Sequence, residues 1–212
     1  FGLRDYVNAH LTQRPIIVIG TGSINGVNVD FFAPDLHSVG IRAELGISDS
    51  STVFIYVGRL VPDKGIVELI KAFTELALIE SEIELLLVGD EEHELTPLPE
   101  MTRDLISKST RIHKLGWQDD VRLFMSAADV FVLTSYREGL PNSVLEAGAM
   151  ALPSIVTDIN GCNEVVEDGA NGTIVPPKDF VALKDAMMFY LESKEAATTM
   201  GQFARDRVIK SF

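Results

Sequence analysis

The chain has 212 residues, of which 46% are hydrophobic and 23% are charged, a composition typical of a globular protein with enough apolar side chains to bury a core. The 18 Lys and Arg residues against 31 Asp and Glu residues give a net charge of -13. This balance argues against nucleic acid and anionic lipid headgroups as partners of the surface as a whole. Any anionic ligand must therefore be bound by a few locally placed cations.

Cysteine content and the first residues bear on compartment and domain organisation. Cys162 is the only cysteine, which excludes an internal disulfide and a thiolate metal cage and suits a reducing compartment. No apolar stretch is long enough to span a membrane, and residues 1–5 lack the pattern of a secretion signal. The chain starts without Met and as if inside a helix. We therefore expect a cytoplasmic piece of a longer polypeptide, with residues 1–14 as a hinge or linker remnant and residues 15–212 as one domain.

In chain order, short apolar runs rich in β-branched residues alternate with longer segments of helical period. Strands are predicted at residues 16–19, 53–57, 83–88, 112–115, 130–133, 154–156 and 173–175. Helices are predicted at residues 64–78, 101–108, 120–127, 142–150, 180–191 and 196–209. This alternation predicts βαβ units, so the expected fold class is α/β, a Rossmann-like parallel sheet flanked by helices.

Nearly every predicted strand ends in a turn residue or a polar residue. Ligands of open α/β sheets bind at the carboxyl ends of the strands, and glycines there let a ligand approach the backbone closely. We therefore expect the binding site along this edge. The residues that would share it are Gly20, Gly58, Arg59, Gly89, Asp90, Gly116, Trp117, Thr134 and Ser135.

Two cations follow the strand that is predicted to end near Gly58. Asp63 is a natural N-cap, which would place Lys64 in the first turn of the next helix, where a cation opposes the helix dipole. A phosphate bound by the free N–H groups of that helix, by Lys64 and by Arg59 would remove the conflict. The alternative is a solvent-exposed Lys64 and an Arg59 that is paired with one of the many carboxylates.

A second unusual segment surrounds Glu146, the only charged residue between residues 142 and 157. A buried carboxylate needs a hydrogen bond or a charge partner. Pro141 suits the first turn of a helix, so Glu146 would face the same edge as Glu138. Such a site fits a nucleotide sugar, because backbone N–H groups bind phosphate and carboxylates accept bonds from vicinal hydroxyls. The alternative is a Glu146 satisfied by neighbouring backbone or by Arg137.

Other signals are weaker. The spacing of Gly20, Gly22 and Gly26 departs from the dinucleotide-binding fingerprint, and no helix is predicted after it. The acidic residues 90–94 precede two prolines and are typical of a solvated loop. No Asp-x-Asp pair occurs, so one common way of holding a divalent ion on a sugar diphosphate is missing. No metal site is therefore predicted.

Taken together, these segments resemble the carboxyl-terminal half of a retaining glycosyltransferase of family 4, whose GT-B architecture joins two Rossmann-like domains. The resemblance covers nearly the whole chain and rests on the order and spacing of its motifs. The matching segments are Asn25-Gly26-Val27 with Asp30-Phe31-Phe32, Gly58-Arg59-Leu60 with Lys64-Gly65, Leu87-Val88-Gly89, Leu115-Gly116, the pair Glu138 and Glu146, Gly161-Cys162-Asn163-Glu164-Val165, and Asn171-Gly172. Departures from the family pattern are Asn28-Val29 before Asp30 and Asn160 before Gly161.

The resemblance implies that Arg59 and Lys64 bind the diphosphate of a nucleotide-sugar donor. Gly139 and Leu140 would offer backbone N–H groups to the phosphates or the sugar, and Gly116 would lie near the base. The donor would be a UDP or GDP sugar, used as a substrate without a metal or cofactor.

The two glutamates have separate implied roles. Glu146 would accept bonds from the ribose hydroxyls, and Glu138 would contact the sugar near the reacting carbon as the catalytic carboxylate. Charge that develops on the leaving diphosphate would be met by cations and helix N-termini in place of a metal.

The implied function is transfer of a hexosyl or related sugar to a glycan or another hydroxyl acceptor, lipid-linked or polysaccharide. The acceptor would sit on an amino-terminal domain that this sequence lacks, so we expect residues 1–212 alone to transfer little sugar. The whole protein is expected in the cytoplasm, peripheral at the inner membrane face through that domain. Two other interpretations remain open, a nucleotide-sugar epimerase of GT-B type and a non-catalytic nucleotide-binding or interaction module.

Overall fold

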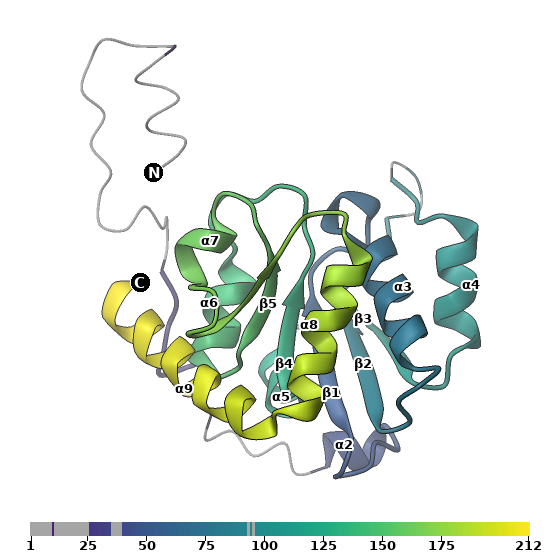
Figure 1. Cartoon of the computed structure of the whole chain (residues 1–212), viewed down its shortest axis with the longest axis horizontal. Coiled ribbons are helices and arrows are strands. Elements are labelled where there is room, and N and C mark those ends of the chain that lie inside the picture. Colours follow the sequence, from purple (N-terminus) through teal and green to yellow (C-terminus); the bar gives the residue numbers. More distant parts are fainter. Residues whose placement is uncertain (1–9, 11–25, 35–39, 93, 95) are drawn as a thin grey trace.

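A parallel six-stranded sheet with helices on both faces forms the body of the molecule (Figure 1). The computed structural model describes residue 10 and residues 26–34, 40–92, 94 and 96–212. The strands are β1 (Thr52–Val57), β2 (Ile83–Val88), β3 (Ile112–Gly116), β4 (Val130–Leu133), β5 (Ser154–Thr157) and β6 (Gly172–Val175). The helices are α2 (Ile41–Glu44), the short 3-10 helix η1 (Pro62–Lys64), α3 (Ile66–Leu76), α4 (Glu100–Lys108), α5 (Arg122–Ser126), α6 (Asn142–Ala149), α7 (Cys162–Val165), α8 (Phe180–Glu192) and α9 (Lys194–Ser211).

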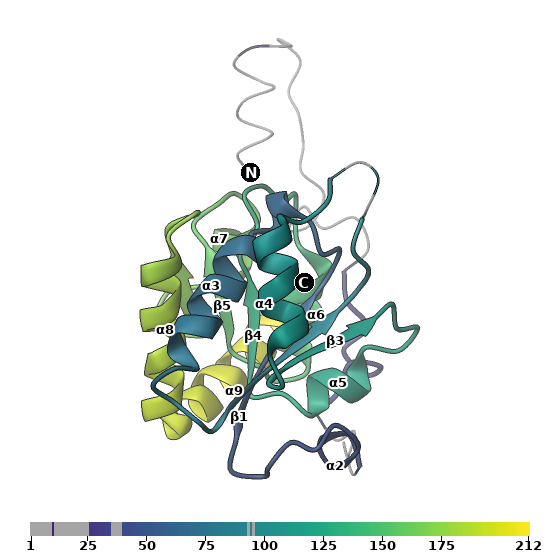
Figure 2. The same ribbon diagram turned by 90° about the vertical axis from the view of Figure 1, so that its right-hand side faces the viewer.

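The strands β1, β2 and β4 are almost purely apolar because they are buried. Residues 53–56 of β1 are fully buried, because helices cover the sheet from both sides. The helices α3, α4 and α8 pack together on one face, whereas α6 and the long α9 pack against each other on the other face (Figures 1 and 2). In α3 the buried residues recur three or four positions apart, as an amphipathic helix requires. Its buried residues are Ile66, Leu69, Ile70, Ala72, Phe73 and Leu76.

The strand order is β3-β2-β1-β4-β5-β6, so the direction in which successive strands are added to the sheet reverses between β1 and β4. In doubly wound sheets the crevice at such a switch point, outside the carboxyl ends of the strands, is where ligands bind. The loops that meet there are the one after β1, which leads into η1, and the one after β4, which leads into α6. The topology therefore brings together the two segments that the sequence marked as unusual.

Most predicted elements are confirmed within one or two residues, and the differences are short or local. The predicted helix 64–78 is wrong at its start, because η1 and Gly65 intervene before α3 begins at Ile66. Asp63 is therefore not an N-cap. That position belongs to Gly65, which has a φ of 69° and no side-chain cap bond. The short helices α2 and α7 were not predicted, since four residues carry no readable periodicity. The predicted strand 16–19 and the linker 1–14 lie outside the described residues, except for residue 10.

Candidate functional site

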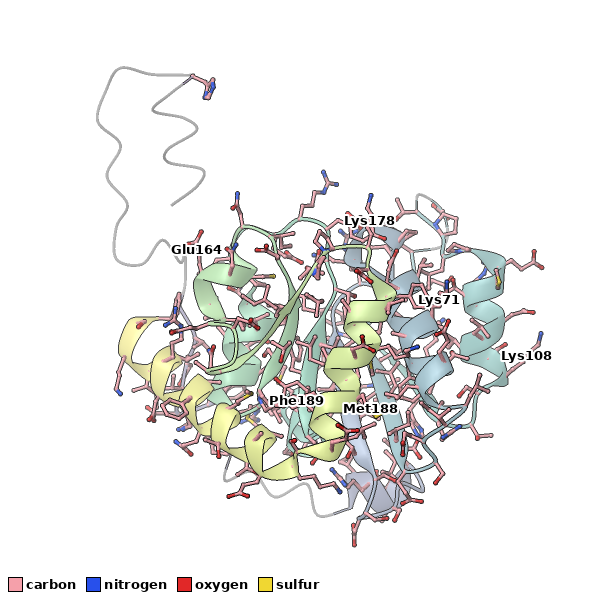
Figure 3. All side chains as sticks on the ribbon, in the orientation of Figure 1. Lys71, Lys108, Glu164, Lys178, Met188 and Phe189 are labelled. Atoms are coloured by element: carbon pink, nitrogen blue, oxygen red, sulfur yellow. The ribbon has the colours of Figure 1, made fainter. Side chains whose placement is uncertain are left out.

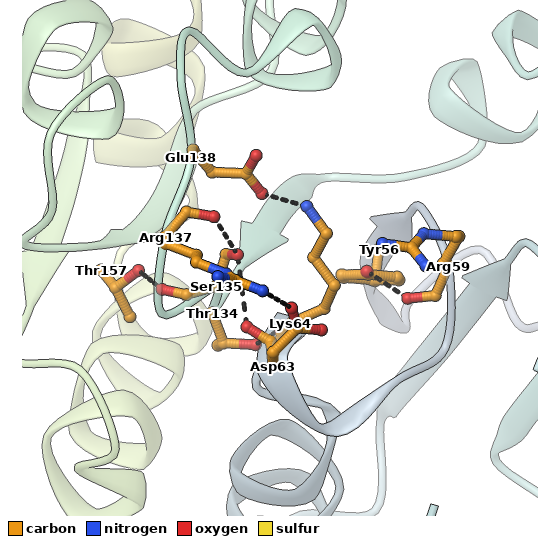
Figure 4. Close-up of polar contacts among 9 residues, drawn as sticks. All are labelled: Tyr56, Arg59, Asp63, Lys64, Thr134, Ser135, Arg137, Glu138 and Thr157. Atoms are coloured by element: carbon orange, nitrogen blue, oxygen red, sulfur yellow. Dashed lines mark hydrogen bonds and ion pairs between the residues drawn. The ribbon is translucent and has the colours of Figure 1, made fainter. Parts of the chain in front are cut away.

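Hydrogen bonds to backbone carbonyl oxygens join the loop after β1 to the loop after β4 (Figure 4). The Thr134 hydroxyl donates to the carbonyl oxygens of Lys64 and Gly65 at 3.0 and 2.9 Å. The Tyr136 amide donates to the Asp63 carbonyl at 2.9 Å. On the other side of η1, the Tyr56 hydroxyl donates to the Arg59 carbonyl at 2.8 Å. These contacts place Lys64 over the switch point with little freedom of its backbone.

Lys64 and Glu138 form an ion pair at the centre of this arrangement. The Lys64 ammonium lies 2.5 Å from Glu138 Oε1, and the two side chains are only 21% and 15% exposed. Figure 4 shows the ammonium pointing across the gap between the two loops toward the carboxylate. The structure thus joins the predicted phosphate ligand Lys64 directly to the predicted catalytic carboxylate.

Arg59 also has a carboxylate partner, in a more open setting. Its guanidinium lies 2.8 Å from Glu92 Oε2, and the two side chains are 63% and 30% exposed. Exposed pairs of this kind are worth little, because water screens both charges. Arg59 is therefore paired with a carboxylate, as the alternative interpretation expected, and its guanidinium remains accessible to an anion.

Gly139 and Leu140 precede α6, whose first turn receives no hydrogen bond from a capping side chain. Gly161 holds this segment in place, because a Cβ atom at Gly161 would overlap the Gly139 carbonyl oxygen and lie 3.4 Å from Pro141 Cδ. The loop after β5 is thus packed directly on the loop after β4. Backbone N–H groups at a helix start are suited to bind anions, so this packing positions the predicted N–H donors.

Glu146 is partly buried on α6, and burial raises the pKa of its carboxyl group. Within the described residues, no hydrogen bond or ion pair reaches its carboxylate. The alternative in which Arg137 satisfies Glu146 is not what the structure shows, because Arg137 is 85% exposed and lies 3.5 Å from Asp63. A shielded carboxylate without a partner costs stability and can accept hydrogen bonds from a ligand.

This cost has a pH dependence whose sign follows from linkage. Because burial raises the folded-state pKa of Glu146 above its ordinary value near 4.5, the folded state binds more protons, and stability falls as the pH rises through the raised pKa. We expect Glu146→Gln to match or exceed the wild type in melting temperature at pH 7, and this advantage should disappear near pH 4. Thermal melts of both proteins across that range measure the difference. A Gln variant that is less stable at pH 7 would show that the carboxylate has a structural partner.

Gly116 ends β3 at the same edge, on the far side of β2 and β1 from Glu138. The Gly89 amide donates to the Gly116 carbonyl at 2.8 Å, and the next amide, that of Trp117, donates to Asp90 Oδ1 at 3.1 Å. The Trp117 side chain is 72% exposed. The predicted base-proximal segment therefore lies at the carboxyl edge, removed from the two glutamates by two strands.

Two contributors to the site were not singled out as functional by the sequence. The Thr134 hydroxyl joins the two loops, and its only signal was its place at a strand end. Cys162 lies fully buried at the start of α7. Burial, together with the nearby Glu138 charge and against the effect of Lys64, raises the pKa of its thiol to about 12. This thiol stays protonated at neutral pH and packs in the hydrophobic core.

Two cavities in the described part of the chain lie away from these residues. One cavity of about 780 Å³ lies beside the junction of α8 and α9, and one of about 400 Å³ lies at the amino ends of β1, β4 and β5. Over the described ranges, no set of three or more His, Cys, Asp or Glu side chains is arranged to hold a metal ion. None of the helices that the structure describes is long and apolar enough to cross a membrane.

Comparison with known proteins identifies the family of the chain. The family described as "Glycosyl transferases group 1" matches residues 40–207. A capsular polysaccharide biosynthesis glycosyltransferase, CapM of Staphylococcus aureus, is 30% identical over 94% of this chain and 52% of its own length. The Escherichia coli UDP-Gal:alpha-D-GlcNAc-diphosphoundecaprenol alpha-1,3-galactosyltransferase is 32% identical over 89% of this chain and 49% of its own length. The chain thus spans about half the length of these relatives.

Solved structures share the fold. Anabaena Alr3699/HepE in complex with UDP superposes with a TM-score of 0.81 at 23% identity, over 89% of this chain and 52% of its own. The same protein has also been solved with UDP-glucose. Because the family model matches residues 40–207, the chain belongs to the group 1 glycosyltransferases of family 4 type. Its parallel sheet and its likeness to the solved structures show that it has the fold of one half of a GT-B enzyme.

Proposed function

We propose that this chain is the donor-binding half of a retaining, metal-independent glycosyltransferase. It takes a hexosyl or related sugar from a UDP or GDP sugar and passes it to a hydroxyl of a glycan or lipid-linked acceptor. The names of relatives that use UDP-galactose and a diphosphoundecaprenol acceptor, and a neighbour that binds UDP, support this choice. The acceptor would be bound by a further domain of the same polypeptide, which would also bring the enzyme to the membrane surface.

The observation that carries the proposal is Glu146, whose shielded carboxylate has no partner in the described part of the chain and stands on α6 beside the switch point. A ribose offers vicinal hydroxyls that would donate to it. The diphosphate would then lie toward Lys64, Arg59 and the backbone N–H groups at Gly139 and Leu140. The base would extend toward Gly116.

The proposed chemistry uses charges that the site already holds. Negative charge grows on the leaving diphosphate oxygens in the transition state, and Lys64, Arg59 and the start of α6 would stabilise it. Glu138 would lie near the anomeric carbon and ease the positive charge that develops there. Because these groups take the role of a metal, we expect a chelator to leave donor binding unchanged.

Replacement of Lys64 tests the proposed site. In calorimetric titrations of the 212-residue chain with UDP and with GDP, we expect Lys64→Ala to weaken binding of the preferred nucleotide by about 10- to 100-fold, the worth of a charge-assisted bond. Lys108→Ala is the matched control. Lys108 pairs with Asp104 on α4 and is well exposed, remote from the switch point (Figure 3), so its loss should leave affinity unchanged.

The result that contradicts the proposal is equally direct. If neither nucleotide binds the wild type, or if the two lysine variants bind alike, the switch point is not a donor site. We also expect the 212-residue chain by itself to transfer little sugar, because its acceptor partner would lie on the further domain.

A further inference from the structure

The Lys64–Glu138 ion pair presents a problem for the proposed donor site. Within the described residues, neither the ammonium nor the carboxylate has another side-chain partner, and both are largely shielded from water. A diphosphate that binds Lys64 favours displacement of Glu138, because two anions that share one shielded ammonium repel each other. The displaced carboxylate cannot be fully rehydrated where it lies, because only 15% of its side chain is exposed.

The free energy of this exchange depends on whether the incoming ligand provides a new hydrogen-bond partner for Glu138. A nucleotide sugar supplies a diphosphate for Lys64 and sugar hydroxyls for Glu138, so both halves of the broken pair gain a new partner. A free nucleoside diphosphate supplies only the first. Separation of a shielded pair that leaves one charge unsatisfied is strongly unfavourable. The free nucleotide is therefore penalised and the intact donor is not.

We propose that the Lys64–Glu138 ion pair exchanges partners when the donor binds, and that it thereby selects the intact nucleotide sugar over the free nucleoside diphosphate. This proposal rests on the function proposed above, and we call the exchanging pair the lock. After transfer the sugar leaves, Glu138 loses its hydroxyl partners, and it competes again with the diphosphate for Lys64. The same pair thus promotes release of the product nucleotide. Glu138 acquires a specificity role in addition to any role at the reacting carbon.

The Arg59–Glu92 pair provides an internal comparison. It joins the second proposed phosphate cation to a carboxylate at 2.8 Å, but with side chains that are 63% and 30% exposed. Water replaces a partner at such a position with little loss. Removal of the Glu92 charge changes the net charge as much as removal of the Glu138 charge, without breaking a shielded pair.

The experiment measures UDP affinity, or GDP affinity if the wild type prefers it, in wild type, Glu138→Gln and Glu92→Gln. We expect Glu138→Gln to bind the free nucleotide about tenfold more tightly, and to release it correspondingly more slowly in stopped-flow chase measurements. Glu92→Gln should change the affinity by less than about twofold. Affinities for UDP-glucose and UDP-galactose are measured as well, and the sugar nucleotide that binds more tightly is compared with UDP. The ratio of these two affinities should be smaller in Glu138→Gln than in the wild type.

A double-mutant cycle separates the exchange from a general effect of charge. On a Lys64→Ala background, Glu138→Gln should leave UDP affinity unchanged, because Glu138 and the diphosphate no longer compete for an ammonium. If Glu138→Gln raises UDP affinity on both backgrounds, the lock is contradicted. If Glu138→Gln does not fold, Glu138→Asp, which retracts the carboxylate by one methylene, should bind UDP a few times more tightly than wild type. If the wild type binds neither UDP nor GDP, the proposed function is wrong. If the wild type binds one of them but neither Glu138→Gln nor Glu138→Asp binds it more tightly, only the lock is wrong.

Discussion

Gly161→Ala should lower UDP affinity by about 100-fold and the free energy of unfolding by about 3 kcal/mol. Gly161 has a φ of 87°, and its missing Cβ atom would overlap the Gly139 carbonyl oxygen. An alanine must therefore push the segment that carries the Gly139 and Leu140 N–H groups away from its position. Hydrogen bonds to a diphosphate fail when their donors shift by about 1 Å.

Gly169→Ala is the matched control for this variant. Gly169 has a similar φ of 74°, but nothing lies within 4 Å of the position of its Cβ atom. The Gly169→Ala variant therefore measures only the strain of an alanine in the left-handed conformation, about 1 kcal/mol. It should leave UDP affinity unchanged. Calorimetry and urea denaturation of the two variants provide the comparison. Equal UDP affinity in both would mean that the Gly139 segment does not bind the phosphates.

Gly65→Ala should have the largest effect on folding, a loss of about 4 kcal/mol out of a total of roughly 5–15 kcal/mol. Gly65 has a φ of 69°, and a Cβ atom there would overlap the Thr134 carbonyl oxygen and lie 2.7 Å from Thr134 Cβ. The same threonine hydroxyl binds the carbonyls of Lys64 and Gly65. The substitution therefore separates the two loops that form the switch-point site.

Gly46→Ala supplies the comparison for folding. Gly46 shares the left-handed conformation, with a φ of 70°, and nothing lies within 4 Å of its Cβ position. We expect it to cost about 1 kcal/mol. Urea denaturation midpoints at constant slope measure both losses. If the two glycine variants lose equal stability, the contact between Gly65 and Thr134 is not a constraint on the fold.

The fold was largely predictable from sequence, because a doubly wound sheet leaves strong local signals. Strands buried on both faces are continuous apolar runs, as in residues 83–88, and a surface helix such as α3 has regularly spaced apolar residues. Elements of three or four residues, such as η1 and α7, lack such periodicity. The N-cap prediction for Asp63 failed because tertiary contact, between Gly65 and the Thr134 carbonyl, sets where α3 begins.

The candidate site was predictable as a set of residue types, but not as a set of contacts. Lys64, Glu138 and Glu146 were each identified from local context, and strand order places all three at one edge. Their donor-binding roles remain predictions. Sequence left open whether Glu146 would be satisfied by Arg137, and the structure answers this because Arg137 turns to solvent beside Asp63.

By itself, the sequence determined that this protein is an α/β domain whose polar and glycine residues end its strands, since periodicity and turn chemistry are local properties of the chain. Its net charge of -13 also determined that an anionic ligand must depend on a few cations. Only the tertiary structure decided which partners those cations have. Lys64 and Glu138 are 74 residues apart, and the pairing of β1 with β4 in the sheet brings them to 2.5 Å from each other. Pairing at such a separation depends on sheet topology, which no local pattern of residues encodes.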